Sequence, residues 1–297
     1  MPHAYPRASI WLGTLVAGIA VGCASGANSS GAAGTTGTAG TTGSAGATGG
    51  GGTTDPYAGF AAKALHVSGN KIVDTTGATV RLLGVNRAGT EYMCVPPTTG
   101  SYTFDGSTGP SSIAALKTWH INTVRLPLNE SCWLGLSGIK QTADQYQADV
   151  EDYVQRLHIQ GIYVVLDLHW SSPTSPATFQ TAMAFSAHGP DFWTSVATRF
   201  KTDPMVIFDL YNEPILDASD SHGNGPVSDP WGCWLNGCGV TSGTLAGMQS
   251  LLNAVRATGA QQIVIAGGVD WAHKLDQWLA KKPSDPTGNL IRINQRR

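Results

Sequence analysis

Asn212 and Glu213 place an amide and a carboxyl group side by side at the end of the apolar stretch 206–211. Burial disfavours the ionised form of a carboxyl group, so a glutamate in such a position can donate a proton near neutral pH as a general acid. The structural alternative is a turn that starts a helix, with Pro214 in the first helical turn and Glu213 favouring the helix dipole. These residues alone leave both interpretations open, and the neighbouring strands decide between them.

Short apolar stretches alternate with helical patterns from residue 55 onward. In the helix predicted for 145–157, apolar residues recur at spacings of three and four. The alternation is typical of a (β/α)8 barrel or of a doubly wound sheet, and the lack of a glycine-rich nucleotide motif after the first strand favours the barrel. We therefore expect an α/β fold of the (β/α)8 TIM barrel type, incomplete, with about five βα units. The predicted strands are 79–85, 121–126, 161–168, 205–211 and 262–266, with the start of a sixth in 289–293.

Four of these strands carry polar side chains at or just beyond their carboxyl ends. In a barrel these ends meet on one face, so the side chains would line a single pocket that contains an acid. Any one of them could instead be a core or loop residue, but four strand ends together favour the pocket. The residues are Asn86, Arg125, His169, Trp170, Asn212 and Glu213.

The strand motifs TVRLLGVN, INTVRLPLN, VVLDLHW and VIFDLYNEP resemble those of the cellulase-type enzymes of glycoside hydrolase family 5, in order and in spacing, over residues 65–290. The resemblance implies a retaining hydrolase of β-1,4-linked glucans in which Glu213 is the acid/base. Arg125 would support the nucleophile electrostatically, while His169 and Asn212 would hold hydroxyl groups of the sugar at the bond that breaks. A β-mannanase of the same family is the alternative within this class.

Tryptophan usage agrees with a sugar substrate, because flat apolar rings suit the C–H faces of pyranoses. Of the nine tryptophans, five follow predicted strands, namely Trp133, Trp170, Trp231, Trp234 and Trp271. We expect Trp170 and Trp271 to bind substrate together with Asn86. Trp119, Trp193 and Trp278 fall in helical patterns and are predicted to be core residues.

The second carboxyl group that a retaining glycosidase needs has no clear position in the sequence. The resemblance places this nucleophile on a glutamate at the end of a seventh strand, yet Glu213 is the last glutamate. Asp270 is the one later aspartate near a predicted strand end, and a side chain from the fifth strand would not reach across the barrel. We expect a truncated or frameshifted copy of a longer gene, without the nucleophile. A non-catalytic carbohydrate-binding protein is the alternative from another class.

The composition of the chain limits the classes of partner that the protein is expected to bind. A formal net charge of -2 gives no excess of positive charge for binding nucleic acid. The eight histidines are scattered without the paired spacing of a metal site. We expect a monomer that acts on a polysaccharide, without a cofactor or a metal.

The amino-terminal region carries features of secretion. Residues 1–22 contain an apolar run too short to cross a bilayer, which is typical of a signal peptide. Residues 23–54 are almost entirely Gly, Ala, Ser and Thr and are predicted to be a flexible linker before a catalytic domain at 55–297. Cys23 stands where a lipoprotein would be lipidated, and ordinary secretion is the alternative. The protein is thus expected outside the cell, secreted or held at its surface by a lipid at Cys23, its only predicted link to a membrane.

The other four cysteines form an even set, as expected for disulfides in a secreted chain. Three pairings are open. We favour Cys94 with Cys132 and Cys233 with Cys238, because each pair would join loops on one side of the predicted barrel.

Overall fold

The computed structural model describes residues 64–96, 102–217 and 226–293. The predicted signal peptide, the linker and Cys23 lie outside these residues, so the predictions for them stay predictions. Among the described residues, no helix combines the length and the apolar character that crossing a bilayer requires.

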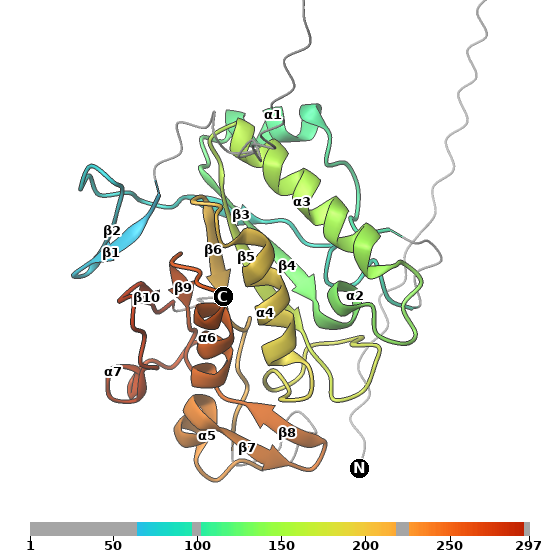
Figure 1. Ribbon diagram of the computed structural model, residues 1–297, viewed down its shortest axis with the longest axis vertical. Helices are drawn as coiled ribbons and strands as arrows, with labels where there is room; N and C mark the ends of the chain where they lie inside the picture. The colour runs from blue at the N-terminus through green and yellow to red at the C-terminus, as the bar shows by residue number, and fades with distance from the viewer. Residues whose placement is uncertain (1–63, 97–101, 218–225, 294–297) are drawn as a thin grey trace, which may run out of the picture. The chain divides into compact units, whose positions relative to one another are not determined.

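The centre of the fold is a six-stranded parallel sheet with the strand order β10-β9-β6-β5-β4-β3 (Figure 1). All five predicted strands are present, and the predicted start of a sixth is β10, so the α/β prediction is confirmed. Within the described residues the sheet is open, with β3 and β10 at its edges; that it is an incomplete barrel stays a prediction. The strands are β3 (Gly84–Asn86), β4 (Thr123–Asn129), β5 (Tyr163–Trp170), β6 (Val206–Asp209), β9 (Val264–Ile265) and β10 (Leu290–Ile291).

The first predicted strand, 79–85, is shorter in the structure than its sequence suggests. The side chain of Asn122 explains the difference. Its Oδ1 accepts from the backbone N–H of Leu83 at 2.8 Å, and its Nδ2 donates to the carbonyl of Arg81 at 2.9 Å. Because these backbone groups bond to a side chain, the parallel ladder with β4 begins only at Gly84.

Helices α3, α4 and α6 lie in front of the sheet in Figure 1, and α3 contains the predicted helix 145–157. The side chain of Thr142 caps α3 by accepting from the N–H of Gln145 at 3.2 Å. Two antiparallel hairpins flank the sheet: β1 (His66–Ser68) with β2 (Lys71–Val73), and β7 (Gly237–Val240) with β8 (Gly243–Ala246). The helices are α1 (Pro110–Thr118), α2 (Glu130–Leu134), α3 (Ala143–Ile159), α4 (Gly189–Phe200), α5 (Pro230–Asn236), α6 (Met248–Ala257) and α7 (Trp278–Lys281).

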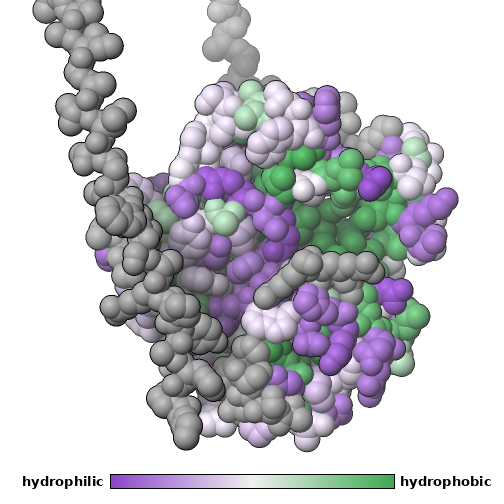
Figure 2. Space-filling view, turned by 180° about the vertical axis from the view of Figure 1, so that it is seen from behind, coloured by the Kyte–Doolittle hydropathy of each residue, from purple (hydrophilic) through white to green (hydrophobic). Residues whose placement is uncertain are grey.

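The two faces of the sheet carry different side chains, because successive residues of a strand point to opposite sides. On β5, Val164, Leu166 and Leu168 belong to the main core under the helices. Val165 belongs to a smaller apolar cluster on the other face, and Asp167 follows it there. Figure 2, seen from behind, shows a hollowed apolar surface beside hydrophilic residues. We call the two sides the helix-covered face and the open face.

The division of the tryptophans into buried and exposed residues differs in part from the sequence prediction. Trp193 and Trp278 are buried as expected, but Trp119 is 63 % exposed because it caps the end of α1 instead of facing the core. The other three tryptophans that follow predicted strands lie in helices α2 and α5, not in loops, and are buried in the main core. They are Trp133, Trp231 and Trp234.

Both favoured disulfides are present. Cys94 and Cys132 join the loop after β3 to α2, and Cys233 and Cys238 join α5 to β7. Each bridge therefore connects segments that follow the carboxyl ends of strands, the region where the sequence predicts the site.

Candidate functional site

Arg125 is the centre of a charged cluster on the open face. Arg125 lies opposite Val165 on the neighbouring strand. Its guanidinium extends toward the carboxyl ends of the strands, as far as Asp167. There Nη2 lies 2.9 Å from Oδ2 of Asp167 and 2.9 Å from Oδ2 of Asp209, which pair with each other in register across β5 and β6. One cation thus joins three adjacent strands.

This cluster is buried, and its charges depend on one another. The side chains of Asp167 and Asp209 are completely buried, whereas that of Arg125 is 16 % exposed. Burial raises the pKa of Asp209 to about 7, although Arg125 acts in the opposite direction. Burial also opposes the charge of Arg125, but the two aspartates outweigh it and raise the pKa of the guanidinium, with a smaller contribution from Glu213. The arginine therefore stays charged and faces several carboxyl groups.

Asn212 is held by the same arginine. Nη2 of Arg125 donates to Oδ1 of Asn212 at 2.9 Å, and Nδ2 of Asn212 donates to Oε1 of Gln180 at 2.7 Å. Gln180 in turn donates through Nε2 to the backbone carbonyl of Glu213 at 2.9 Å. This chain of bonds fixes the orientation of the Asn212 amide. It also anchors the backbone of Glu213, whose side chain is partly exposed.

His169 projects beside the cluster and is oriented by it. Its Nδ1 lies 2.6 Å from Oδ2 of Asp167, and its side chain is 22 % exposed. When this nitrogen donates to the carboxylate, the imidazole is held in one tautomer, and Nε2 is left as the acceptor for a ligand. The predicted residues Arg125, His169, Asn212 and Glu213 are therefore brought together, but Arg125 lies inside β4, which continues to Asn129, and only its guanidinium reaches the region where β5 and β6 end.

The predicted substrate-binding residues Asn86 and Trp170 lie around this group. Asn86 is exposed and pairs in register with Arg125 at the edge strand β3. Trp170 ends β5 and is partly buried, with its ring centroid 6.5 Å from that of Tyr92.

Trp271 lies in a turn that packs against the segment carrying Glu213. Residues 270–272 have three consecutive left-handed backbone conformations, with φ of 56°, 59° and 59°. The N–H of Trp271 donates to the carbonyl of Pro214 at 3.0 Å, directly after Glu213. A Cβ on Gly268 would lie 1.9 Å from the carbonyl oxygen of Lys274, so the turn can approach only because residue 268 is glycine.

Asp209 and Gln180 complete the group, and neither is among the residues that the sequence predicts for the site. The sequence does contain a signal for Asp209. It lies two residues after Ile207 in the same strand, so both side chains are on one face, and this face also carries Asp167. An acidic residue at a position where an apolar one is expected indicates a polar site. Gln180 lies in a loop without a pattern that marks it.

Asn129, one of the polar residues at the end of β4, has a structural role because its side chain accepts from the N–H groups of Ser131 and Cys132 at the start of α2.

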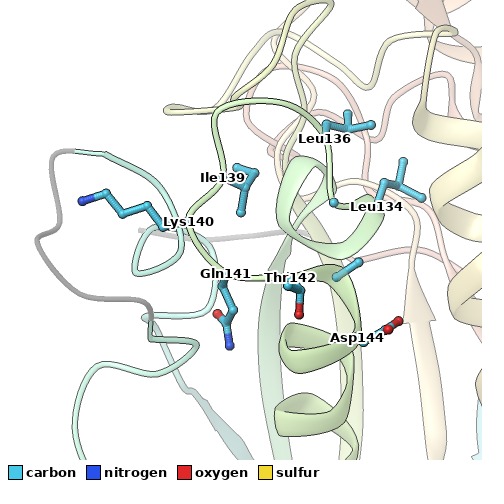
Figure 3. Close-up of a pocket in the computed structure, with 9 residues that line it drawn as sticks. Leu134, Leu136, Ile139, Lys140, Gln141, Thr142 and Asp144 are labelled. Atoms are coloured by element: carbon cyan, nitrogen blue, oxygen red, sulfur yellow. The ribbon is translucent and has the colours of Figure 1, made fainter.

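A separate hollow of about 400 Å³ lies where α2 leads into α3 (Figure 3). Its lining includes Leu134, Ile139 and Asp144, and it contains none of the predicted site residues. Within the part of the chain that the structure describes, no group of three or more His, Cys, Asp or Glu residues is arranged to hold a metal ion.

Known proteins of similar sequence include endoglucanases. Endoglucanase C of Evansella cellulosilytica is 23 % identical over 240 residues, which are 77 % of this chain and 26 % of that protein. Endoglucanase A of Butyrivibrio fibrisolvens is 25 % identical over 158 residues, which are 52 % of this chain and 33 % of that protein. The chain thus spans about a quarter to a third of the length of these two relatives.

Two solved structures, both with bound oligosaccharides, share the fold. The β-glucanase SdGluc5_26A from Saccharophagus degradans, solved in complex with cellotetraose, aligns with a TM-score of 0.59 and 24 % identity over 79 % of this chain and 62 % of that chain. XacCel5A, solved in complex with cellopentaose, aligns with a TM-score of 0.51 and 20 % identity over 72 % of this chain and 64 % of that chain. The sequence model described as cellulase (glycosyl hydrolase family 5) matches residues 73–292. Since that match covers most of the chain, this protein belongs to glycosyl hydrolase family 5, the cellulase family.

Proposed function

We propose that this protein is an endo-β-1,4-glucanase-type hydrolase in which Glu213 is the acid/base. The observation that carries the proposal is the arrangement around Arg125, which contacts Asp167, Asp209 and Asn212 beside Glu213. A partly exposed carboxyl group beside an oriented amide and an oriented imidazole can protonate a glycosidic oxygen while neighbouring groups hold the sugar.

Each of the other predicted residues has a place in this proposal. Arg125 keeps the local charge balanced, while Asn212 and His169 bind hydroxyl groups at the bond that breaks. Asn86, Trp170 and Trp271 bind the substrate on either side. The cello-oligosaccharides in the structures of SdGluc5_26A and XacCel5A favour a β-1,4-glucan as the polysaccharide partner.

We also propose that the protein acts outside the cell, secreted or lipid-anchored. Two disulfides in one small domain are compatible with an oxidising compartment.

Release of reducing sugar from carboxymethyl cellulose and from mannan tests the enzymatic proposal. If the 297-residue protein releases reducing sugar, we expect it to favour carboxymethyl cellulose and Glu213→Gln to lower the rate by about 10²- to 10⁴-fold, the usual contribution of a general acid; such activity would also contradict the prediction that the nucleophile is missing. Glu151→Gln is the matched control, because Glu151 lies on α3 and pairs with Arg199 at 3.1 Å, outside the cluster. A preference for mannan would instead support the β-mannanase alternative.

A second arm uses an aryl β-cellobioside with added azide, which can take the place of a nucleophile at the anomeric carbon while Glu213 protonates the departing oxygen. Turnover that requires azide would support the prediction that this chain lacks the nucleophile. Activity without azide that Glu213→Gln abolishes would make that prediction wrong. If folded protein shows no turnover in either arm, the hydrolase proposal fails and the carbohydrate-binding alternative is favoured.

A further inference from the structure

The loop after β3 presents a carboxyl group and an aromatic ring beside the Glu213 site. Glu91 is 7 % exposed, and its Oε2 accepts from the N–H of Gly89 at 2.7 Å. Burial raises the pKa of Glu91, and the charges of His169 and Asp167 also act on this carboxyl group. Glu91 directly precedes Tyr92, whose ring lies beside Trp170, the residue that follows His169 in β5.

Tyr92 stands next to this carboxyl group and forms an aromatic pair with Trp170. The ring centroids are 6.5 Å apart and the ring planes are inclined by 46°. The hydroxyl of Tyr92 donates to Oδ2 of Asp105 at 2.7 Å, an interaction that raises the pKa of the phenol to about 12. The ring is thus fixed at its polar end, and both rings keep part of their surface exposed.

The backbone of this loop is held from several directions. The Cys94–Cys132 disulfide ties it to α2, and Nδ2 of Asn129 donates to the carbonyl of Glu91 at 2.8 Å. The hydroxyl of Tyr146 donates to the carbonyl of Thr90 at 2.8 Å. A loop fixed in this way can present side chains to a ligand without being ordered by it, which lowers the entropic cost of binding.

We propose that Glu91 and Tyr92, together with Trp170, form a sugar-binding subsite adjoining the Glu213 site that takes one glucosyl unit of the chain. This inference rests on the proposed function and extends it to two residues on the loop after β3. The ring of Tyr92 covers an apolar C–H face of the sugar, as aromatic rings do with flat apolar surfaces. The carboxylate of Glu91 accepts a hydrogen bond from a sugar hydroxyl group.

Calorimetric titration with cellotetraose tests the subsite, in a Glu213→Gln background so that the oligosaccharide is not cleaved. We expect Tyr92→Ala to weaken the affinity about tenfold, which corresponds to roughly 1.4 kcal/mol, and Glu91→Gln to weaken it several-fold. Tyr92→Phe keeps the ring and should stay within about twofold of the parent. Trp119→Ala is the control, because Trp119 is also an exposed aromatic residue but precedes β4, at the amino ends of the strands.

The outcomes separate the subsite from the function on which it rests. If the parent binds cellotetraose and Tyr92→Ala binds it equally well, the subsite is wrong while the proposed substrate class stands. If the parent binds no cello-oligosaccharide, the proposed function fails and the subsite fails with it. Thermal unfolding of each variant checks folding, and Tyr92→Leu, which removes the flat ring but keeps an apolar side chain, replaces Tyr92→Ala if the latter unfolds.

Discussion

The two faces of the six-stranded sheet are built from the same strands but differ in what they do. The helix-covered face is apolar along its whole length, as Leu166 and Phe208 illustrate, and belongs to the main core. The open face is apolar only toward the amino ends, where Val165 and Ile207 lie, and becomes charged two residues later at Asp167 and Asp209.

The difference shows how one strand sequence can encode both packing and chemistry. Because side chains alternate, β5 and β6 can fill a core with every second residue and place carboxyl groups with the others. On the open face, two buried carboxyl groups are accommodated because Arg125 faces both.

Among the substitutions that test this comparison, removal of Arg125 should have the largest effect on stability. Arg125→Met would leave Asp167 and Asp209 buried without their cation and should lower the free energy of unfolding by about 3–5 kcal/mol. Urea unfolding at pH 8 measures the loss.

The matched control for this change is Arg156→Met on α3. Arg156 pairs with Asp152 at 2.7 Å, but the two side chains are 41 % and 54 % exposed. An exposed pair of this kind contributes at most about 1 kcal/mol. Equal losses in the two variants would show that burial of the open-face cluster has no energetic consequence.

Truncations on the two faces of β6 compare their packing directly. Phe208→Ala should cost about 3–5 kcal/mol, because the helices hold the cavity open. Ile207→Ala should cost about 2 kcal/mol, since the open face can collapse or admit water more easily. Both side chains are at most 1 % exposed in the native protein, so exposure does not explain the difference. A larger loss for Ile207→Ala in chemical denaturation would reverse the assignment of the faces.

Glu130 sharpens the comparison, since it is a buried carboxyl group whose hydrogen bonds come from Ser171 and Ser172 and not from an arginine. Burial raises the pKa of Glu130 from 4.5 to about 7. The folded state therefore holds a proton that the unfolded state releases, and the stability from this group is complete below about pH 4.5 and is lost as the pH rises through about 7.

Between pH 5 and pH 7, we expect the contribution of Glu130 to reach about 1.4 kcal/mol per pH unit, and Glu130→Gln should remove this contribution while that of Asp209, whose pKa is also raised to about 7, stays. Unfolding free energies of the two proteins across this range provide the measurement. A pH dependence that is unchanged in Glu130→Gln would show that other groups cause it.

Much of the sheet could be predicted, because five apolar stretches bounded by polar residues mark the strands. The boundaries were less predictable. Residues 79–83 have a strand-like sequence, but the side chain of Asn122 bonds their backbone, and nothing in the local pattern indicates this long-range contact. The prediction that Trp119 is a core residue was wrong for a similar reason, because a helical pattern does not show that the residue caps the end of α1.

The candidate site was predictable where its residues lie at or just beyond strand ends, as with His169 near the end of β5 and Glu213, which follows β6. Asp209 was hidden inside an apolar run, and only its alternation with Ile207 shows that it shares a face with Arg125. Gln180 and Glu91 come from loops, whose positions depend on tertiary contacts such as the Cys94–Cys132 bridge and not on any periodicity.

A crystal structure of Glu213→Gln with cellotetraose would test the central claim most directly. We predict that the oligosaccharide lies across the carboxyl ends of β4, β5 and β6 on the open face, with sugar hydroxyl groups on Asn212 and His169. Binding confined to the hollow between α2 and α3, or no binding by the folded protein, would contradict the claim that the open face is the active site.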